Sequence, residues 1–129
     1  MKFIGKFITE DLPGGEDVWK VSLPFSFIDS KGIRHGVPAG FISDGASIPR
    51  VLWPVVGHPR DTDIGQAAAL HDLQYRYATV SRKRADEIIC EGMECLGASW
   101  AKRKAVYAGL RMGGWVAWKR YRKYSKASA

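Results

Sequence analysis

The sequence predicts an α+β fold in a single domain, residues 1–129, in which a small N-terminal antiparallel sheet precedes a C-terminal part of three to four helices. Three observations predict this fold. Polar and apolar residues alternate in the first forty positions, and apolar residues recur at helical spacing after Ile48. The length of 129 residues is that of one ordinary domain. We assign residues 1–47 to the sheet part and residues 48–129 to the helical part.

Three segments are expected to form the sheet. Phe3 to Ile8 alternates, and Val18 to Ile28 is rich in Val, Phe and Trp with polar residues between them. A turn cluster follows, so Ile33 to Val37 is expected to pair back as the second arm of a hairpin. Pro24 and Pro38 have no N–H for a sheet hydrogen bond. We therefore expect short strands or strands at an edge.

The first two helical segments differ in how regular a helix they are expected to form. Ile48 to Val56 contains two prolines and ends at a glycine, so it is expected to form at most two broken turns. Asp61 to Ala78 places Ile64, Ala67, Ala68, His71 and Tyr75 on one face at i, i+3, i+4 spacing. Either Asp61 or Thr62 is expected to cap the start of this helix.

Two further helices complete the prediction. Ser81 is expected to cap a helix that runs to about Leu96 and closes at Gly97. Ser99 is expected to cap a last helix that reaches about Tyr124. Two adjacent glycines at 113 and 114 indicate a break or a close packing contact within it.

Composition excludes several classes of protein. Apolar residues make up 46% of the chain and charged residues 26%, the balance of a globular protein. The apolar runs are too short to span a bilayer, and the N-terminal residues do not form a signal peptide. Two cysteines five residues apart predict neither a disulfide framework nor a zinc site. We therefore expect synthesis in a reducing cytosol.

Charge is distributed unevenly along the chain. Residues 95–129 hold nine of the twenty Lys and Arg residues and no Asp or Glu. This imbalance indicates an anionic partner, such as a membrane surface, a nucleic acid or an acidic protein face. Basic residues with aromatic residues between them suit a membrane surface, and they also suit the phosphate backbone of a nucleic acid. A solvated helix face is the plainer alternative. The candidate anion-binding residues are Arg111, Lys119, Arg120, Arg122 and Lys123.

Five residues form a candidate catalytic constellation. Asp44 lies in an Asp-Gly loop, and Asp72 is a second carboxylate, so the two are candidate ligands of a hard cation such as Ca²⁺. His71 is suited to abstract a proton from water near neutral pH. Tyr75 lies one turn beyond His71 on the same face and is expected to position a hydrogen-bond partner. Asp86, on the next helix, is expected to accept from the second ring nitrogen of His71.

Each of these residues also has a plainer interpretation. His71 lies on an apolar face, where a histidine is commonly a hydrogen-bonded core residue. Asp86 follows Arg82 by four residues, which suits an ordinary helical ion pair. Asp44 before a glycine suits a simple turn. The catalytic interpretation therefore depends on all of these side chains meeting around one site.

Four stretches resemble a family of small phage and prophage proteins of unknown function. They are Ser43-Asp44-Gly45-Ala46-Ser47-Ile48-Pro49-Arg50, His71-Asp72 with Tyr75, Arg84-Ala85-Asp86, and residues 107–114 with Ala117-Trp118. The resemblance covers nearly the whole chain after residue 20. It implies a bacteriophage or prophage origin, synthesis in the host cytoplasm and, for a structural protein, a place in the virion. It implies no activity.

The order of the Asp-Gly loop, His71-Asp72-x-x-Tyr75 and the Arg-x-Asp helix is also similar to bacterial and fungal secreted phospholipases of the A-two group. This resemblance implies His71 as the base, Asp72 and Asp44 with loop carbonyls as a Ca²⁺ site, and Asp86 as the partner of His71. The chain departs from that group in lacking its disulfide, since Ala46 and Ala68 occupy the matching positions. It also adds an N-terminal sheet.

Two functions follow as expectations. The first is a phage-encoded metal-dependent hydrolase that acts on an ester such as a phospholipid. The second is a non-catalytic phage protein, either a virion component of the tail, neck or baseplate that binds other phage structural proteins, or a protein that binds a host factor. A nucleic-acid binder ranks third, because only the basic C-terminal segment favours it. Substrate and oligomeric state do not follow from the sequence.

Overall fold

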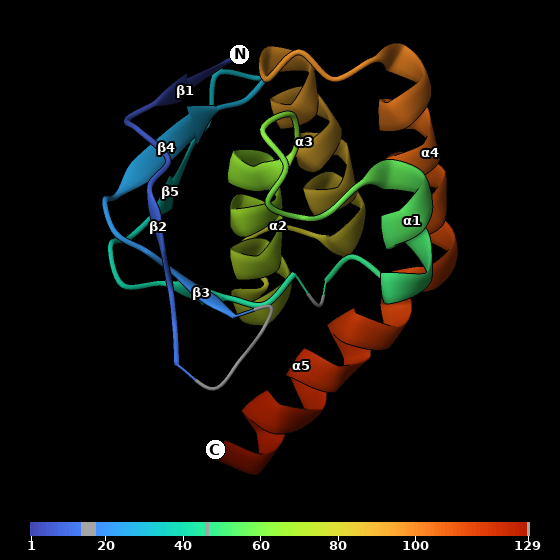
Figure 1. Cartoon of the computed structure of the whole chain (residues 1–129). Coiled ribbons are helices and arrows are strands. Elements are labelled where there is room, and N and C mark those ends of the chain that lie inside the picture. Colours follow the sequence, from blue (N-terminus) through green and yellow to red (C-terminus); the bar gives the residue numbers. More distant parts are fainter. Residues whose placement is uncertain (14–17, 46, 129) are drawn as a thin grey trace.

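The computed structural model describes residues 1–13, 18–45 and 47–128, and it confirms the α+β class. Strands occupy the N-terminal part and helices the C-terminal part, as Figure 1 shows. The α2 helix (Gly65–Tyr77) lies between the strands and the remaining helices. The candidate residues His71, Asp72 and Tyr75 are therefore at the centre of the molecule.

The strands form two small antiparallel sheets rather than the one that the sequence predicts. The first sheet has the order β1 (Lys2–Ile4), β4 (Phe25–Ile28) and β5 (Arg34–Val37), and the second has the order β2 (Thr9–Asp11), β3 (Trp19–Val21) and β6 (Ile42–Ser43). Of the predicted strand from Phe3 to Ile8, only the start is a strand, in β1, whereas the predicted strand from Val18 to Ile28 is divided between the two sheets as β3 and β4. The second one breaks at Ser22-Leu23-Pro24, because proline cannot donate a sheet hydrogen bond.

The β4–β5 turn is anchored to α3 (Arg82–Cys95) by a polar cluster. Asp29 is 2% exposed, and its carboxylate lies 2.8 Å from His35 Nε2 and 3.0 Å from a guanidinium nitrogen of Arg84. Glu91 accepts from the backbone N–H of Ser30 at 2.7 Å. Burial would raise the pKa of the Asp29 carboxyl, but the bonds from His35, Ile33 and Arg84 hold it below its usual range.

The helices begin and end partly as predicted. The hydroxyl groups of Ser81 and Ser99 accept from the N–H groups three residues later, at the starts of α3 and α4 (Trp100–Gly113). Gly97 has φ of 87° after α3, where a left-handed backbone favours glycine. The prediction for α2 is wrong at its start: the residue before the helix is Ile64, with no side-chain cap. Asp61 instead closes a turn through its carbonyl.

Two short elements precede α2, and the last predicted helix is divided. A 3₁₀ helix, Arg50–Leu52, leads into the single turn of α1 (Trp53–Val56). The chain bends at Gly114, which separates α4 from α5 (Trp115–Ser128). Glycine is needed there because a Cβ at residue 114 would collide with the Tyr75 hydroxyl group.

Burial of α2 explains why polar residues collect around it. Every residue from Gly65 to Tyr75 is buried, whereas the sequence predicts one apolar face. Leu70 and Leu73 pack in a core shared with the strands, while Ala67 and Ala68 pack in a core shared with the other helices. A central helix covered on all sides has no solvent for its polar side chains, so they require partners inside the protein.

Candidate functional site

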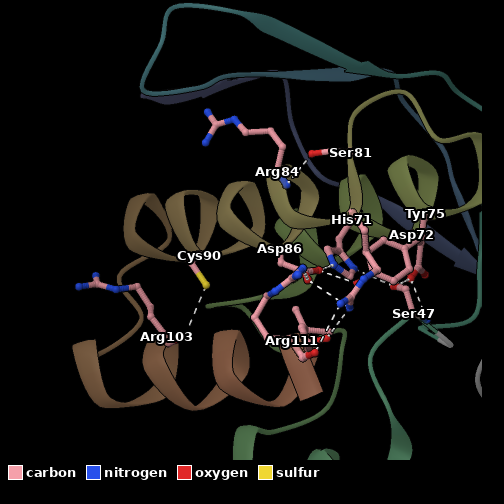
Figure 2. Close-up of polar contacts among 12 residues, drawn as sticks. Ser47, His71, Asp72, Tyr75, Ser81, Arg84, Asp86, Cys90, Arg103 and Arg111 are labelled. Carbon is pink, nitrogen blue, oxygen red and sulfur yellow. Dashed lines mark hydrogen bonds and ion pairs between the residues drawn. The ribbon is translucent and has the colours of Figure 1, made fainter. Parts of the chain in front are cut away.

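The His71 side chain joins a hydroxyl group to a carboxylate in the interior. Its Nδ1 atom lies 2.9 Å from Ser47 Oγ, and its Nε2 atom lies 2.9 Å from Asp86 Oδ1, as Figure 2 shows. The three residues come from the loop after β6, from α2 and from α3. The imidazole is 1% exposed. The expected contact between Asp86 and the second ring nitrogen is therefore present, while the catalytic role of both groups stays a prediction.

Asp86 has partners on three helices. Besides His71, it accepts a hydrogen bond from the Tyr75 hydroxyl group at 2.6 Å and one from Arg111 Nη1 at 2.8 Å. Arg82 Nη1 lies 3.6 Å from the same carboxylate. Burial would raise the pKa of Asp86, but the hydrogen bond and charge of His71, with the bonds from Tyr75 and Arg111, hold it below its usual value. Asp86 is therefore an ionised anchor for the imidazole ring.

Asp72 points from α2 into the loop that follows β6. Its carboxylate accepts hydrogen bonds from the hydroxyl groups of Ser43 and Ser47. It also accepts from the backbone N–H groups of Gly45 at 3.0 Å and Ser47 at 3.3 Å. Gly45 has φ of 69°, which lets the loop turn its amides toward the helix. Among the described residues of the loop, four hydrogen bonds to Asp72 thus hold the loop against α2.

Two buried carboxyl groups on either side of His71 have opposite pKa shifts. Burial raises the pKa of Asp72 although the serine hydroxyl groups oppose it, and the nearby charge of Asp44 raises it further. Asp86 is shifted downward. Groups whose environments push their pKa values apart are typical of sites that carry out acid and base chemistry.

The Ser47 hydroxyl group lies between Asp72 and His71, and the hydrogen atoms along this chain can take two arrangements. In the first, His71 Nδ1 donates to Ser47, and Ser47 donates to an ionised Asp72. In the second, a protonated Asp72 donates to Ser47, and Ser47 donates to a neutral His71. The hydrogen bond from Ser47 to Asp72 described above is that of the first arrangement, and the raised pKa of Asp72 lowers the cost of reaching the second. In the second arrangement, the serine proton points at a base.

The surroundings of Asp72 do not suit the predicted Ca²⁺ site. Hard cations require oxygen ligands, including carbonyls, whereas the loop residues that the structure describes present two N–H groups and two hydroxyl groups to this carboxylate. Asp44, the other predicted ligand, is half-buried. Within residues 1–13, 18–45 and 47–128, no group of three or more His, Cys, Asp or Glu side chains is placed to hold a metal ion.

The five predicted anion-binding residues separate into two groups. Arg111 is bonded to Asp86, and Arg122 donates to the carbonyl oxygens of Tyr75 and Arg76 at 2.6 and 2.7 Å. The sequence predicts these two arginines for a partner, but the structure places them in contacts within the chain. The remaining three lie exposed on the outer side of α5: Lys119, Arg120 and Lys123.

The inner side of α5 covers the site. The Trp118 ring meets the Tyr75 ring edge-on, with centroids 5.2 Å apart. Burial and the negative charges of Asp72 and Asp44 raise the pKa of Tyr121 to about 12. The basic C-terminal helix therefore has a structural side and a solvent side.

Sequence reasoning missed three participants. Ser43 and Ser47 belong to a motif that the sequence analysis identifies, but the pairing of a loop serine with a helix 25 residues later is a long-range contact. Arg82 was considered only as a helical partner of Asp86, yet it also donates to the carbonyl of Leu110 at 2.9 Å. Ser47 lies in a loop without a hydrophobic period, so its sequence position does not indicate that it contacts His71.

Comparisons with known proteins place these residues in a family. The chain is 35% identical over 105 residues to the uncharacterized protein y4jT of Sinorhizobium fredii, covering 80% of this chain and 30% of that protein. It is 31% identical over 116 residues to the uncharacterized protein y4iH of the same organism, covering 86% of this chain and 48% of that one. The chain thus spans less than half the length of these relatives. No solved structure matches.

A family model matches residues 19–110, which include Ser47, His71, Asp72, Tyr75 and Asp86. Helix α5 and Arg111 lie beyond the matched residues. No helix among the described residues has the length and hydropathy needed to cross a membrane. The chain belongs to the family described as protein of unknown function DUF1353.

Proposed function

We propose that the chain is a hydrolase of carboxylic esters in which His71 is the general base and Asp86 fixes its ring. The observation that carries this proposal is the position of the imidazole, 2.9 Å from a hydroxyl group on one nitrogen and 2.9 Å from an ionised carboxylate on the other. A hydroxyl group, an imidazole and a carboxylate in this order are the parts of a nucleophilic relay.

The chemistry follows from the proton arrangement. Ser47 Oγ attacks the ester carbonyl carbon while its proton moves to His71 Nδ1. The imidazolium then gives that proton to the departing alcohol, and the C–O bond breaks to leave an acyl-serine. Water repeats the sequence on the acyl group, which restores Ser47 and releases a carboxylic acid. Asp86 stabilises the transient imidazolium, and Tyr75 and Arg111 hold Asp86 in place.

The test uses p-nitrophenyl esters of increasing acyl length, with a chelator present. We expect release of p-nitrophenol by the wild-type chain and a loss of about a thousandfold or more in the Ser47→Ala and His71→Gln variants. Ser26→Ala is the matched control, because this serine lies on β4 and bonds Arg34 instead of the site. Equal rates in all four proteins, or no rate above buffer, contradict the proposal.

Burial favours a second candidate function. Asp72 and Asp86 are 0% exposed and His71 is 1% exposed, so a substrate reaches the imidazole only when part of the covering structure moves. The same contacts suit a structural brace that ties this loop to α2 and α3. In that case the chain is a non-catalytic phage or prophage protein, either a virion component or a protein that binds a host factor.

Two measurements separate the candidates. Under the second one, His71→Gln lowers the melting temperature but no ester is cleaved by the wild-type chain. Mass spectrometry of purified particles from an induced lysogen that carries the gene then detects the chain if it is a virion component and does not detect it if it binds a host factor. Its absence from particles, together with ester cleavage, favours the hydrolase and synthesis that ends in the host cytoplasm.

A further inference from the structure

One surface of the molecule combines exposed apolar residues with exposed Lys and Arg side chains. It lies where the 3₁₀ helix, the end of α4 and the start of α5 meet. We call it the junction face and define it by six residues: Val51, Met112, Val116, Lys119, Arg120 and Lys123.

The apolar members of the junction face are exposed to an unusual degree. Val51 and Met112 are each 79% exposed, and Val116 is 46% exposed. Trp115 beside them is 49% exposed. Large apolar side chains that gather on one surface with polar neighbours mark an interaction site, whereas single exposed ones are ordinary.

Packing brings these segments together although they are far apart in the sequence. A Cβ at Gly113 would lie 3.3 Å from Pro49, so the segment before Val51 lies directly against the end of α4. A groove of about 440 Å³ then runs between this segment and α5. Arg50 and Arg120 both line it, together with Val116. Two guanidinium groups therefore border an apolar surface.

The basic members meet no acidic neighbour along their own segment. Lys119, Arg120 and Lys123 are exposed, and residues 95–129 contain no Asp or Glu. The Nζ atom of Lys119 lies 5.0 Å from the centre of the Trp115 ring, which positions its charge over an aromatic side chain. The opposite side of α5 is already used against Tyr75, so the outer side is the one left for a partner.

We infer that the junction face binds the surface of an anionic lipid bilayer. Protruding aliphatic side chains gain by entering the acyl boundary, and the adjacent Lys and Arg residues meet lipid phosphates. Nucleic acid fits less well, because its phosphate backbone gains nothing from Val51, Met112 and Val116. The inference stands on the exposed surface alone and holds whether or not His71 is catalytic.

The experiment measures cosedimentation of the full chain with vesicles of phosphatidylcholine alone or with 30% phosphatidylserine. We expect binding only to the anionic vesicles, with weakening as salt is raised. The triple variant K119Q/R120Q/K123Q is expected to bind about a hundredfold more weakly, from about 1 kcal/mol for each basic residue near such a surface. The apolar variant M112S/V116S is expected to lose about tenfold.

The matched control is K2Q/K6Q/K83Q, which removes the same charge from exposed lysines outside the junction face. Circular dichroism melting of each variant checks that it is folded. Equal weakening by the control, unchanged binding by M112S/V116S, or no binding of the wild-type chain to anionic vesicles each overturns the inference. So does binding of a 20-mer duplex DNA at lower protein concentrations than the anionic vesicles.

Discussion

Replacement of Asp86 by alanine removes the carboxylate on which the buried contacts of His71, Tyr75 and Arg111 converge. The carboxylate is 0% exposed and accepts from His71 at 2.9 Å, Tyr75 at 2.6 Å and Arg111 at 2.8 Å. Its removal leaves a buried hydroxyl group and a buried ring nitrogen without an acceptor and leaves the Arg111 charge without its counter-ion. Breaking such a buried network by removing one partner costs about 3–5 kcal/mol.

The expected effect on melting follows from the size of the chain. An unfolding entropy of about 2.1 cal/mol/K per residue means that 1 kcal/mol shifts the melting temperature by about 4 °C for a domain of this size. Asp86→Ala is therefore expected to melt about 11–18 °C below the wild-type chain. Differential scanning calorimetry and urea unfolding measure this difference.

A double-mutant cycle adds a check on the mechanism. Tyr75→Phe removes one donor and is expected to cost about 1–1.5 kcal/mol in the wild-type background. It is expected to cost much less in the Asp86→Ala background, because the acceptor is then already absent. Additive effects, or an Asp86→Ala variant within about 1 kcal/mol of the wild type, would refute the network as described.

Three other predictions follow from buried groups. The pKa of Asp72 is raised in the folded chain, so the folded state holds its proton longer, and stability falls as the pH rises above the unfolded value of about 3.9. Asp72→Asn is expected to flatten that slope in urea unfolding, and an unchanged slope rejects the shift. Burial raises the pKa of the Cys90 thiol to about 12, whereas Cys95 is exposed. Iodoacetamide at pH 8 is therefore expected to label Cys95 first, as measured by peptide mass spectrometry. Equal labelling of the two cysteines contradicts this prediction. Gln74 is 0% exposed, and neither polar atom of its amide has a partner among the described residues. Gln74→Leu is therefore expected to raise the melting temperature by about 4 °C. A melting temperature below that of the wild-type chain is evidence against an unpaired amide.

Local signals account for the parts of the fold that the sequence predicts correctly. The caps at Ser81 and Ser99 and the glycine at 97 are found where the sequence places them, because each depends on atoms within four residues. The contact of His71 with Asp86 is also predicted from the sequence, because the two residues lie on consecutive helices that pack against each other.

Long-range packing accounts for what the sequence does not reveal. In the sequence, Arg111 is not distinguished from the other basic residues of its helix. The packing of α4 on α3 brings it to Asp86. The sequence indicates only that Ser47 lies in a loop. The packing of this loop against α2 brings its hydroxyl group to His71. The division of the strands into two sheets depends on which strands pair, and alternation alone does not determine pairing.

Covalent labelling of Ser47 tests the central claim most directly, because it needs no knowledge of the natural ester. A fluorophosphonate reacts with a serine hydroxyl group that a neighbouring imidazole has activated. We expect peptide mass spectrometry to find the phosphonyl group on Ser47 in the wild-type chain and to find none in His71→Gln. A wild-type chain that stays unlabelled at Ser47 while it is folded contradicts a catalytic His71 and leaves the buried residues as a structural brace.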